Sequence, residues 1–135
     1  MKKVILIGIL FIGSILMAQS TNSPSDTRFV GSWSGSEKNQ QQIGLEKHWI
    51  MHRFADGTFI LLFTTIQDGE VSSLAEKGKW WTENNEFHEL HFVSGATDIY
   101  SYAFLDDYHV KFKSKVVVEA TQETYEFIDT KVIDY

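Results

Sequence analysis

The sequence predicts an all-β fold, a single eight-stranded antiparallel up-and-down barrel that follows a signal-peptide helix. Eight runs rich in β-branched and aromatic residues succeed one another, and a short turn signal separates each from the next. After the N-terminal segment, no window of about 11 residues shows a helical apolar stripe. Closing the sheet removes its two exposed edges, which favours a barrel. A two-sheet sandwich is the alternative, and it needs longer crossover loops than this chain offers.

The N-terminal segment has the three parts of a secretory signal peptide. Lys2 and Lys3 precede an apolar stretch, and the small residue Ala18 precedes a polar segment. A membrane anchor is the alternative, but a transmembrane helix needs about 20 apolar residues. The expected organisation is a signal peptide over residues 1–18, a flexible lead-in over 19–27 and a barrel domain over 28–135. The protein is expected to be exported and to be periplasmic or secreted.

Turn chemistry separates the expected strands. Asp68-Gly69 and Asn84-Asn85 are turn signals because Gly, Asn and Asp tolerate positive φ angles. Apolar, β-prone residues lie between the turns, and short connections favour pairing of each strand with its neighbour in sequence. The expected strands cover residues 29–35, 45–54, 58–66, 73–83, 87–93, 99–105, 108–118 and 121–132.

The central hairpin turns at Asp56-Gly57, a dipeptide that favours a two-residue type I′ loop. Such a loop places Phe54 opposite Phe59, points His52 toward the interior and leaves Arg53 outside. A register shifted by one residue reverses every one of these side chains. Arg53 then becomes a buried cation suited to a ligand carboxylate.

The interior of the predicted barrel is rich in rings, because the chain has ten Phe, five Tyr and four Trp residues. A barrel of eight strands either fills with side chains or encloses one small ligand. A filled aromatic core is one outcome, and a site for a small hydrophobic molecule is the other. The predicted ligand-binding residues are Ile50, His52, Phe54, Phe59, Leu61, Phe63, Trp80, Tyr100, Tyr102, Phe112, Tyr125 and Phe127.

Several short motifs resemble a known family. Gly31-Ser32-Trp33 in the first strand, the Asp56-Gly57 hairpin and a second Gly-x-Trp at Gly78 are similar to patterns of lipocalins. The small bacterial lipocalin-like, calycin-type domains show the same combination. The resemblance implies a barrel that binds a small apolar ligand without catalysis. It also implies that Trp33 plugs the closed end of the barrel and that Lys131 packs over it, where the family has an arginine.

Composition and spacing argue against several functions. Without residues 1–18 the chain has 10 Lys and Arg against 18 Asp and Glu, a net charge of −8, which does not attract nucleic acid. The absence of Cys excludes disulfides and thiolate metal sites. His88 and His91 lie three residues apart on a strand and point to opposite faces. Glu76 and Glu89 are candidate acids only if they point inward. The prediction is a protein without enzymatic activity, metal or cofactor.

Two function classes follow. The first is an exported carrier or sensor with a small hydrophobic ligand inside the barrel. The second is a periplasmic or extracellular protein-interaction module, of the inhibitor or immunity type, whose barrel is filled. An apolar-lined mouth of a few hundred Å³ favours the carrier. An exposed aromatic patch rimmed by acidic residues favours the module.

Overall fold

The computed structural model describes residues 25–118 and 123–133 of the chain, so the predicted signal peptide lies outside the described residues. A short 3₁₀ helix, η1 (Thr27–Phe29), precedes eight strands. Eight strands therefore form where the alternating patterns predicted them, with small differences at their ends. The strands are β1 (Gly31–Lys38), β2 (Glu46–Arg53), β3 (Thr58–Gln67), β4 (Glu70–Glu83), β5 (Glu86–His91), β6 (Thr97–Asp106), β7 (His109–Val118) and β8 (Glu123–Lys131).

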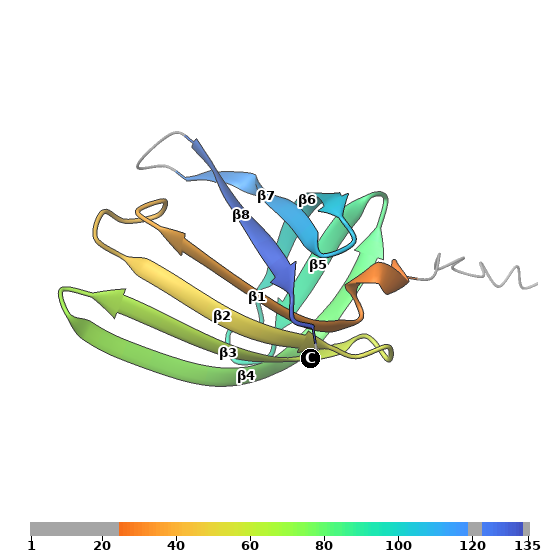
Figure 1. Ribbon diagram of the computed structural model, residues 1–135, viewed down its shortest axis with the longest axis horizontal. Coiled ribbons are helices and arrows are strands. Elements are labelled where there is room, and N and C mark those ends of the chain that lie inside the picture. Colours follow the sequence, from red (N-terminus) through yellow and green to blue (C-terminus); the bar gives the residue numbers. More distant parts are fainter. Residues whose placement is uncertain (1–24, 119–122, 134–135) are drawn as a thin grey trace, which may run out of the picture.

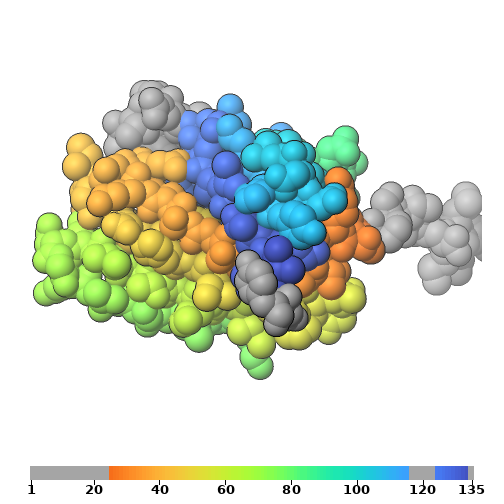
Figure 2. All heavy atoms as spheres, in the orientation of Figure 1, coloured from red at the N-terminus to blue at the C-terminus, as the bar shows by residue number. Residues whose placement is uncertain are grey.

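The strands close into one antiparallel up-and-down barrel in which each strand pairs with its neighbour in sequence (Figure 1). β8 returns to β1, where Trp33 lies opposite Lys131 and Gly35 lies opposite Asp129. In the space-filling view of Figure 2, atoms of β8 (blue) lie against those of β1 (orange). The predicted barrel is confirmed, and the sandwich alternative is excluded.

The closing seam between β1 and β8 is short, because the two strands pair only from Trp33 to Gly35. Beyond that point the side chain of Gln40, rather than the backbone of β1, forms hydrogen bonds with the backbone of β8. Its amide nitrogen donates to the carbonyl oxygen of Glu126 at 2.5 Å, and its amide oxygen accepts from the Glu126 N–H at 2.9 Å. One glutamine thus satisfies both backbone groups of a residue on β8.

The turns at Asp68-Gly69 and Asn84-Asn85 form as predicted. All four residues have positive φ, between 51° and 80°, and they join β3 to β4 and β4 to β5 through two-residue loops. Positive φ at both central positions is the feature of type I′ turns, whose twist matches that of the flanking strands.

The loop at Asp56-Gly57 differs from the prediction of a type I′ turn. Gly57 has a positive φ of 84°, and Asp56 does not share it. The Phe54 N–H donates to the Thr58 carbonyl, and the Gly57 N–H donates back to the Phe54 carbonyl. Residues 55–57 therefore form a three-residue loop that ends on a glycine in the left-handed region. The extra loop residue places Arg53, rather than Phe54, opposite Phe59.

This register corrects the predicted inner face of β2. Arg53 points inward and is only 2% exposed, whereas Ile50 is 56% exposed and Phe54 is 39% exposed. His52 lies on the outer face, where its Nδ1 hydrogen-bonds the Ser32 hydroxyl at 2.7 Å. The prediction that Ile50, His52 and Phe54 face the interior was wrong, because a shift of one residue reverses every side chain of a strand.

The short helix η1 and the hairpin loop between β2 and β3 lie at the same end of the barrel (Figure 1). Aromatic side chains fill the interior at this end. Phe29 belongs to η1 rather than to the first strand, and its ring centroid lies 4.8 Å from that of Phe87. Trp33 Nε1 donates to the Phe29 carbonyl at 2.9 Å. Lys131 Nζ lies 5.5 Å from the Trp33 ring, in the place where the family resemblance implies a basic residue. These contacts cap one end of the interior.

Candidate ligand cavity

A cavity of about 420 Å³ occupies the barrel interior beyond this aromatic end. Its apolar wall comes from β2, β3, β6 and β8, and it includes Trp49, Phe63, Tyr100 and Phe127. Charged side chains also contribute to the lining. The volume lies within the range of about 300–1,000 Å³ that small-molecule sites occupy. The charged lining residues are Lys47, Arg53, Glu76, Glu89, His91, Asp98 and Asp129.

The predicted ligand-binding residues fall into three groups. Those that line the cavity are Leu61, Phe63, Tyr100, Tyr125 and Phe127. Those that pack in the aromatic core without lining the cavity are Phe59, Trp80, Tyr102 and Phe112. Those outside the interior are Ile50, His52 and Phe54, as the register of β2 requires.

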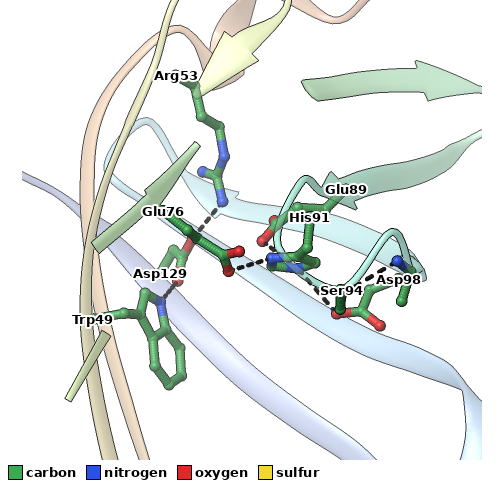
Figure 3. Close-up of polar contacts among 9 residues, drawn as sticks. Trp49, Arg53, Glu76, Glu89, His91, Ser94, Asp98 and Asp129 are labelled. Atoms are coloured by element: carbon green, nitrogen blue, oxygen red, sulfur yellow. Dashed lines mark hydrogen bonds and ion pairs between the residues drawn. The ribbon is translucent and has the colours of Figure 1, made fainter. Parts of the chain in front are cut away.

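A buried ion pair lies on the inner wall and joins β2 to β8 (Figure 3). Arg53 Nη2 donates to Asp129 Oδ2 at 2.9 Å, and Trp49 Nε1 donates to Asp129 Oδ1 at 2.8 Å. Asp129 is fully buried. Its carboxylate therefore holds together an arginine and a tryptophan of β2 in a region of low dielectric, where such contacts are strongest.

A second polar cluster surrounds His91 at the end of β5 (Figure 3). His91 Nδ1 lies 2.6 Å from Glu76 Oε1, and its Nε2 lies 3.3 Å from Glu89 and 3.2 Å from Asp98. Hydrogen bonds that its ring donates to Asp98 and Glu89 raise the pKa of His91 to about 11, against a smaller opposing effect of burial. The ring is therefore an imidazolium shared by three carboxylates.

The two tyrosines of the cavity wall are held in their neutral form. Burial is the main reason that the pKa values of Tyr100 and Tyr125 are raised, and nearby carboxylates add to the effect. Toward the other end of the cavity, Lys47 Nζ lies 3.1 Å from Glu37 Oε1 and 5.0 Å from the Tyr125 ring centroid. The wall thus combines neutral phenols with paired charges.

Sequence reasoning missed most of the polar lining, although a signal for it is present. Tyr125 and Phe127 are predicted to point inward, and the same period of two continues to Asp129. On β5 the same period of two places Glu89 and His91 on the face of Phe87. The prediction followed the aromatic rings along each strand, so charged residues at equivalent positions were passed over.

The histidines and the helices bear on two further expectations, those about metal sites and membrane spans. His88 stacks on Trp81 outside the barrel whereas His91 lines the cavity, so these two histidines do point to opposite faces. Among residues 25–118 and 123–133, no three His, Asp or Glu side chains are arranged to hold a metal ion. The described part of the chain also contains no helix with the length and apolarity to span a membrane.

The structure defines the class of protein as a closed eight-stranded antiparallel barrel with an internal cavity. No protein-family model matches the chain, and no curated protein matches it. Among solved structures, the chain is similar to a "Bovine Odorant Binding Protein deswapped triple mutant". The two share 16% identity over 79% of this chain and 76% of that chain, with a TM-score of 0.42. A similarity of this extent carries no functional argument, so the function has to be argued from the cavity itself.

Proposed function

We propose that this protein is an exported, lipocalin-like carrier that binds one small, largely apolar molecule inside its barrel and does not transform it. The observation that carries the proposal is the internal cavity of about 420 Å³, whose wall combines aromatic and aliphatic side chains with paired charges. Folding alone favours a filled interior, since protein cores pack to a high density. A cavity of this size beside an otherwise continuous aromatic core supports a site for a ligand.

A binding role, rather than catalysis, is supported by the pairing of the polar groups. Glu76 and Glu89 do point inward, the condition for treating them as candidate acids, but both contact the same imidazolium. Asp129 is held by Arg53 and Trp49. A general acid or base needs a group free to exchange its proton with a substrate. Each of these three carboxylates instead contacts a cation of the barrel interior.

The protein-interaction alternative finds less support on the described surface. It calls for an exposed aromatic patch rimmed by acids, as interface anchors are enriched in aromatic residues. The apolar side chains exposed together on β2 and β3 are instead aliphatic, namely Ile50, Ile60 and Leu62. Their nearest outward neighbours in the sheet include His52 and Lys77, which are not acidic.

The test uses two neighbouring leucines of β3. Leu61 lines the cavity and is 5% exposed, whereas Leu62 points outward and is 49% exposed. Leu61→Trp adds bulk inside the cavity, and Leu62→Trp adds the same bulk outside. A hydrophobic fluorescent probe such as aminoanthracene is expected to bind the natural protein and Leu62→Trp with equal affinity. It is expected to bind Leu61→Trp at least tenfold more weakly.

Circular dichroism and urea unfolding of both variants establish that each is folded before binding is compared. The proposal would be overturned if the probe bound all three proteins equally, because binding would then be outside the cavity. Native mass spectrometry of the purified protein provides a second measurement. A small molecule retained by the natural protein and lost from Leu61→Trp supports the carrier, whereas a stoichiometric protein partner supports the interaction module.

A further inference from the structure

Arg53 has more hydrogen-bonding capacity than the barrel uses. Its Nη2 donates to Asp129, but Nε and Nη1 have no hydrogen-bond partner among the described residues. The side chain is 2% exposed and lines the cavity. Buried N–H groups without a partner are uncommon, and each one disfavours the folded state. An unpaired donor on a side chain that lines a cavity is therefore a position where a ligand acceptor gains affinity.

The surroundings of the guanidinium supply π faces rather than acceptor oxygens. The Arg53 Cζ lies 4.9 Å from the Phe87 ring centroid, 5.6 Å from that of Phe112 and 5.7 Å from that of Phe29. These rings attract the positive charge electrostatically. They do not replace a hydrogen bond to oxygen, which is directional and short. The donor capacity is left for a molecule that enters the cavity.

The charges around the cavity decide which kind of acceptor fits. Asp129 already neutralises Arg53, and the single cation His91 is shared by Glu76, Glu89 and Asp98. Lys47 is paired with Glu37. Carboxylates thus outnumber cations by five to three (Glu37, Glu76, Glu89, Asp98 and Asp129 against Lys47, Arg53 and His91). A ligand carboxylate adds to this excess in a region of low dielectric, where like charges repel strongly. A neutral oxygen accepts the same hydrogen bonds without that penalty.

The geometry points to a specific ligand class: a neutral, mainly apolar molecule with one strong acceptor oxygen, such as an ester or ketone, which accepts a hydrogen bond from one of the two unpaired nitrogens of Arg53, Nε or Nη1. The inference rests on the proposed function, since it describes the ligand of the same cavity. The apolar body of the molecule packs against Leu61, Phe63 and Phe127 on the cavity wall. The oxygen lies at the end of the cavity formed by Arg53 and Asp129.

The experiment compares four molecules with ten carbons each: methyl nonanoate, decanoate, decylamine and decane. Each displaces a fluorescent probe from the natural protein. Methyl nonanoate is expected to bind at least about tenfold more tightly than decane, the gain of a hydrogen bond to a charged donor. It is also expected to bind more tightly than decanoate. Tighter binding of decanoate overturns the inference, and so does tighter binding of decylamine, which would assign the site to the carboxylates around His91.

The matched protein variant is the double substitution Arg53→Met with Asp129→Asn. It removes one charge of each sign and keeps an amide oxygen that accepts from Trp49 Nε1. In this variant methyl nonanoate is expected to lose its advantage over decane, so that the ratio of the two affinities falls to about one whatever the affinity of decane itself. If the ester keeps that advantage, its oxygen does not bind Arg53 and the inference is wrong.

A second measurement does not depend on any variant. In the natural protein, adding methyl nonanoate is expected to shift the NMR signals of the Arg53 side-chain N–H groups (Nε and Nη1), and adding decane is expected to shift them much less. Equal shifts overturn the inference. Failure of all four molecules, decane included, to displace the probe is a different result, because it overturns the proposed function together with the ligand class.

Discussion

The buried pair of Arg53 and Asp129 leads to a double-mutant cycle with a sharp outcome. Asp129 is fully buried and Arg53 is 2% exposed, so each charge lies in a region of low dielectric and depends on its partner. Arg53→Met leaves a buried carboxylate with only the Trp49 N–H, and Asp129→Asn leaves a buried guanidinium without an anion. Breaking a buried pair on one side costs about 3–5 kcal/mol. Each single variant is therefore expected to lose that much free energy of unfolding.

The double variant removes both charges, and the side-chain amide introduced at position 129 still offers an oxygen to Trp49 Nε1. Replacing both members of a buried pair is often neutral or even stabilising, so the double variant is expected within about 1–2 kcal/mol of the natural protein. Urea unfolding of the four proteins at one pH gives the coupling free energy. Additive losses from the two single variants would refute the reasoning, because they would mean that neither charge depends on the other.

Three further predictions concern other parts of the barrel. Trp33→Ala removes a fully buried ring from the closed end and is expected to lower the free energy of unfolding by about 3–5 kcal/mol. Urea unfolding measures this loss. A loss near zero contradicts the role of Trp33 as a plug of the closed end. The raised pKa of His91, about 11, means that the folded protein keeps a proton that the unfolded chain releases near pH 6.5. The free energy of unfolding is thus expected to fall as pH rises from about 6.5 toward 11. His91→Gln is expected to make this fall less steep between about pH 6 and 9. If the free energy of unfolding changes with pH equally in the two proteins, the raised pKa of His91 is wrong. Gln40→Ala removes both side-chain hydrogen bonds to the Glu126 backbone and is expected to cost about 1–3 kcal/mol. Hydrogen exchange at the Glu126 amide is expected to accelerate in Gln40→Ala. An unchanged exchange rate would mean that Gln40 does not protect the Glu126 N–H.

Local chemistry was sufficient to predict the strands, most of the turns and the closure of the sheet. Alternation placed Tyr100, Phe112 and Phe127 on inner faces, and each packs in the core or against it. These features depend on short segments, in which period two and turn residues carry the information. Fold class could therefore be read from the sequence, because many independent segments supported the same answer.

The inward position of Arg53 could not be predicted in this way, because it depends on the register of one hairpin. Asp56-Gly57 suits a two-residue loop as well as a longer one. Trp80 on β4 distinguishes the two possibilities. Its N–H donates to the Gly57 carbonyl at 2.8 Å, and its Nε1 donates to the Phe54 carbonyl at 3.0 Å. A contact between residues far apart in the sequence thus accompanies the longer loop, which turns Arg53 toward the interior.

The contact of the hairpin loop with β4 can be tested by two matched glycine substitutions. Gly57 and Gly69 both have positive φ, 84° and 80°, so an alanine at either position is strained by about 1–2 kcal/mol. A Cβ at Gly57 lies 3.3 Å from the Trp80 carbonyl oxygen, whereas a Cβ at Gly69 meets nothing within 4 Å. Gly57→Ala is therefore expected to lower the free energy of unfolding more than Gly69→Ala does, because only the first substitution pushes its loop away from Trp80. Urea unfolding at one pH measures the difference between the two losses. Equal losses would mean that backbone strain is the whole effect, and the docking of this loop on β4 would then have no part in holding Arg53 inside the barrel.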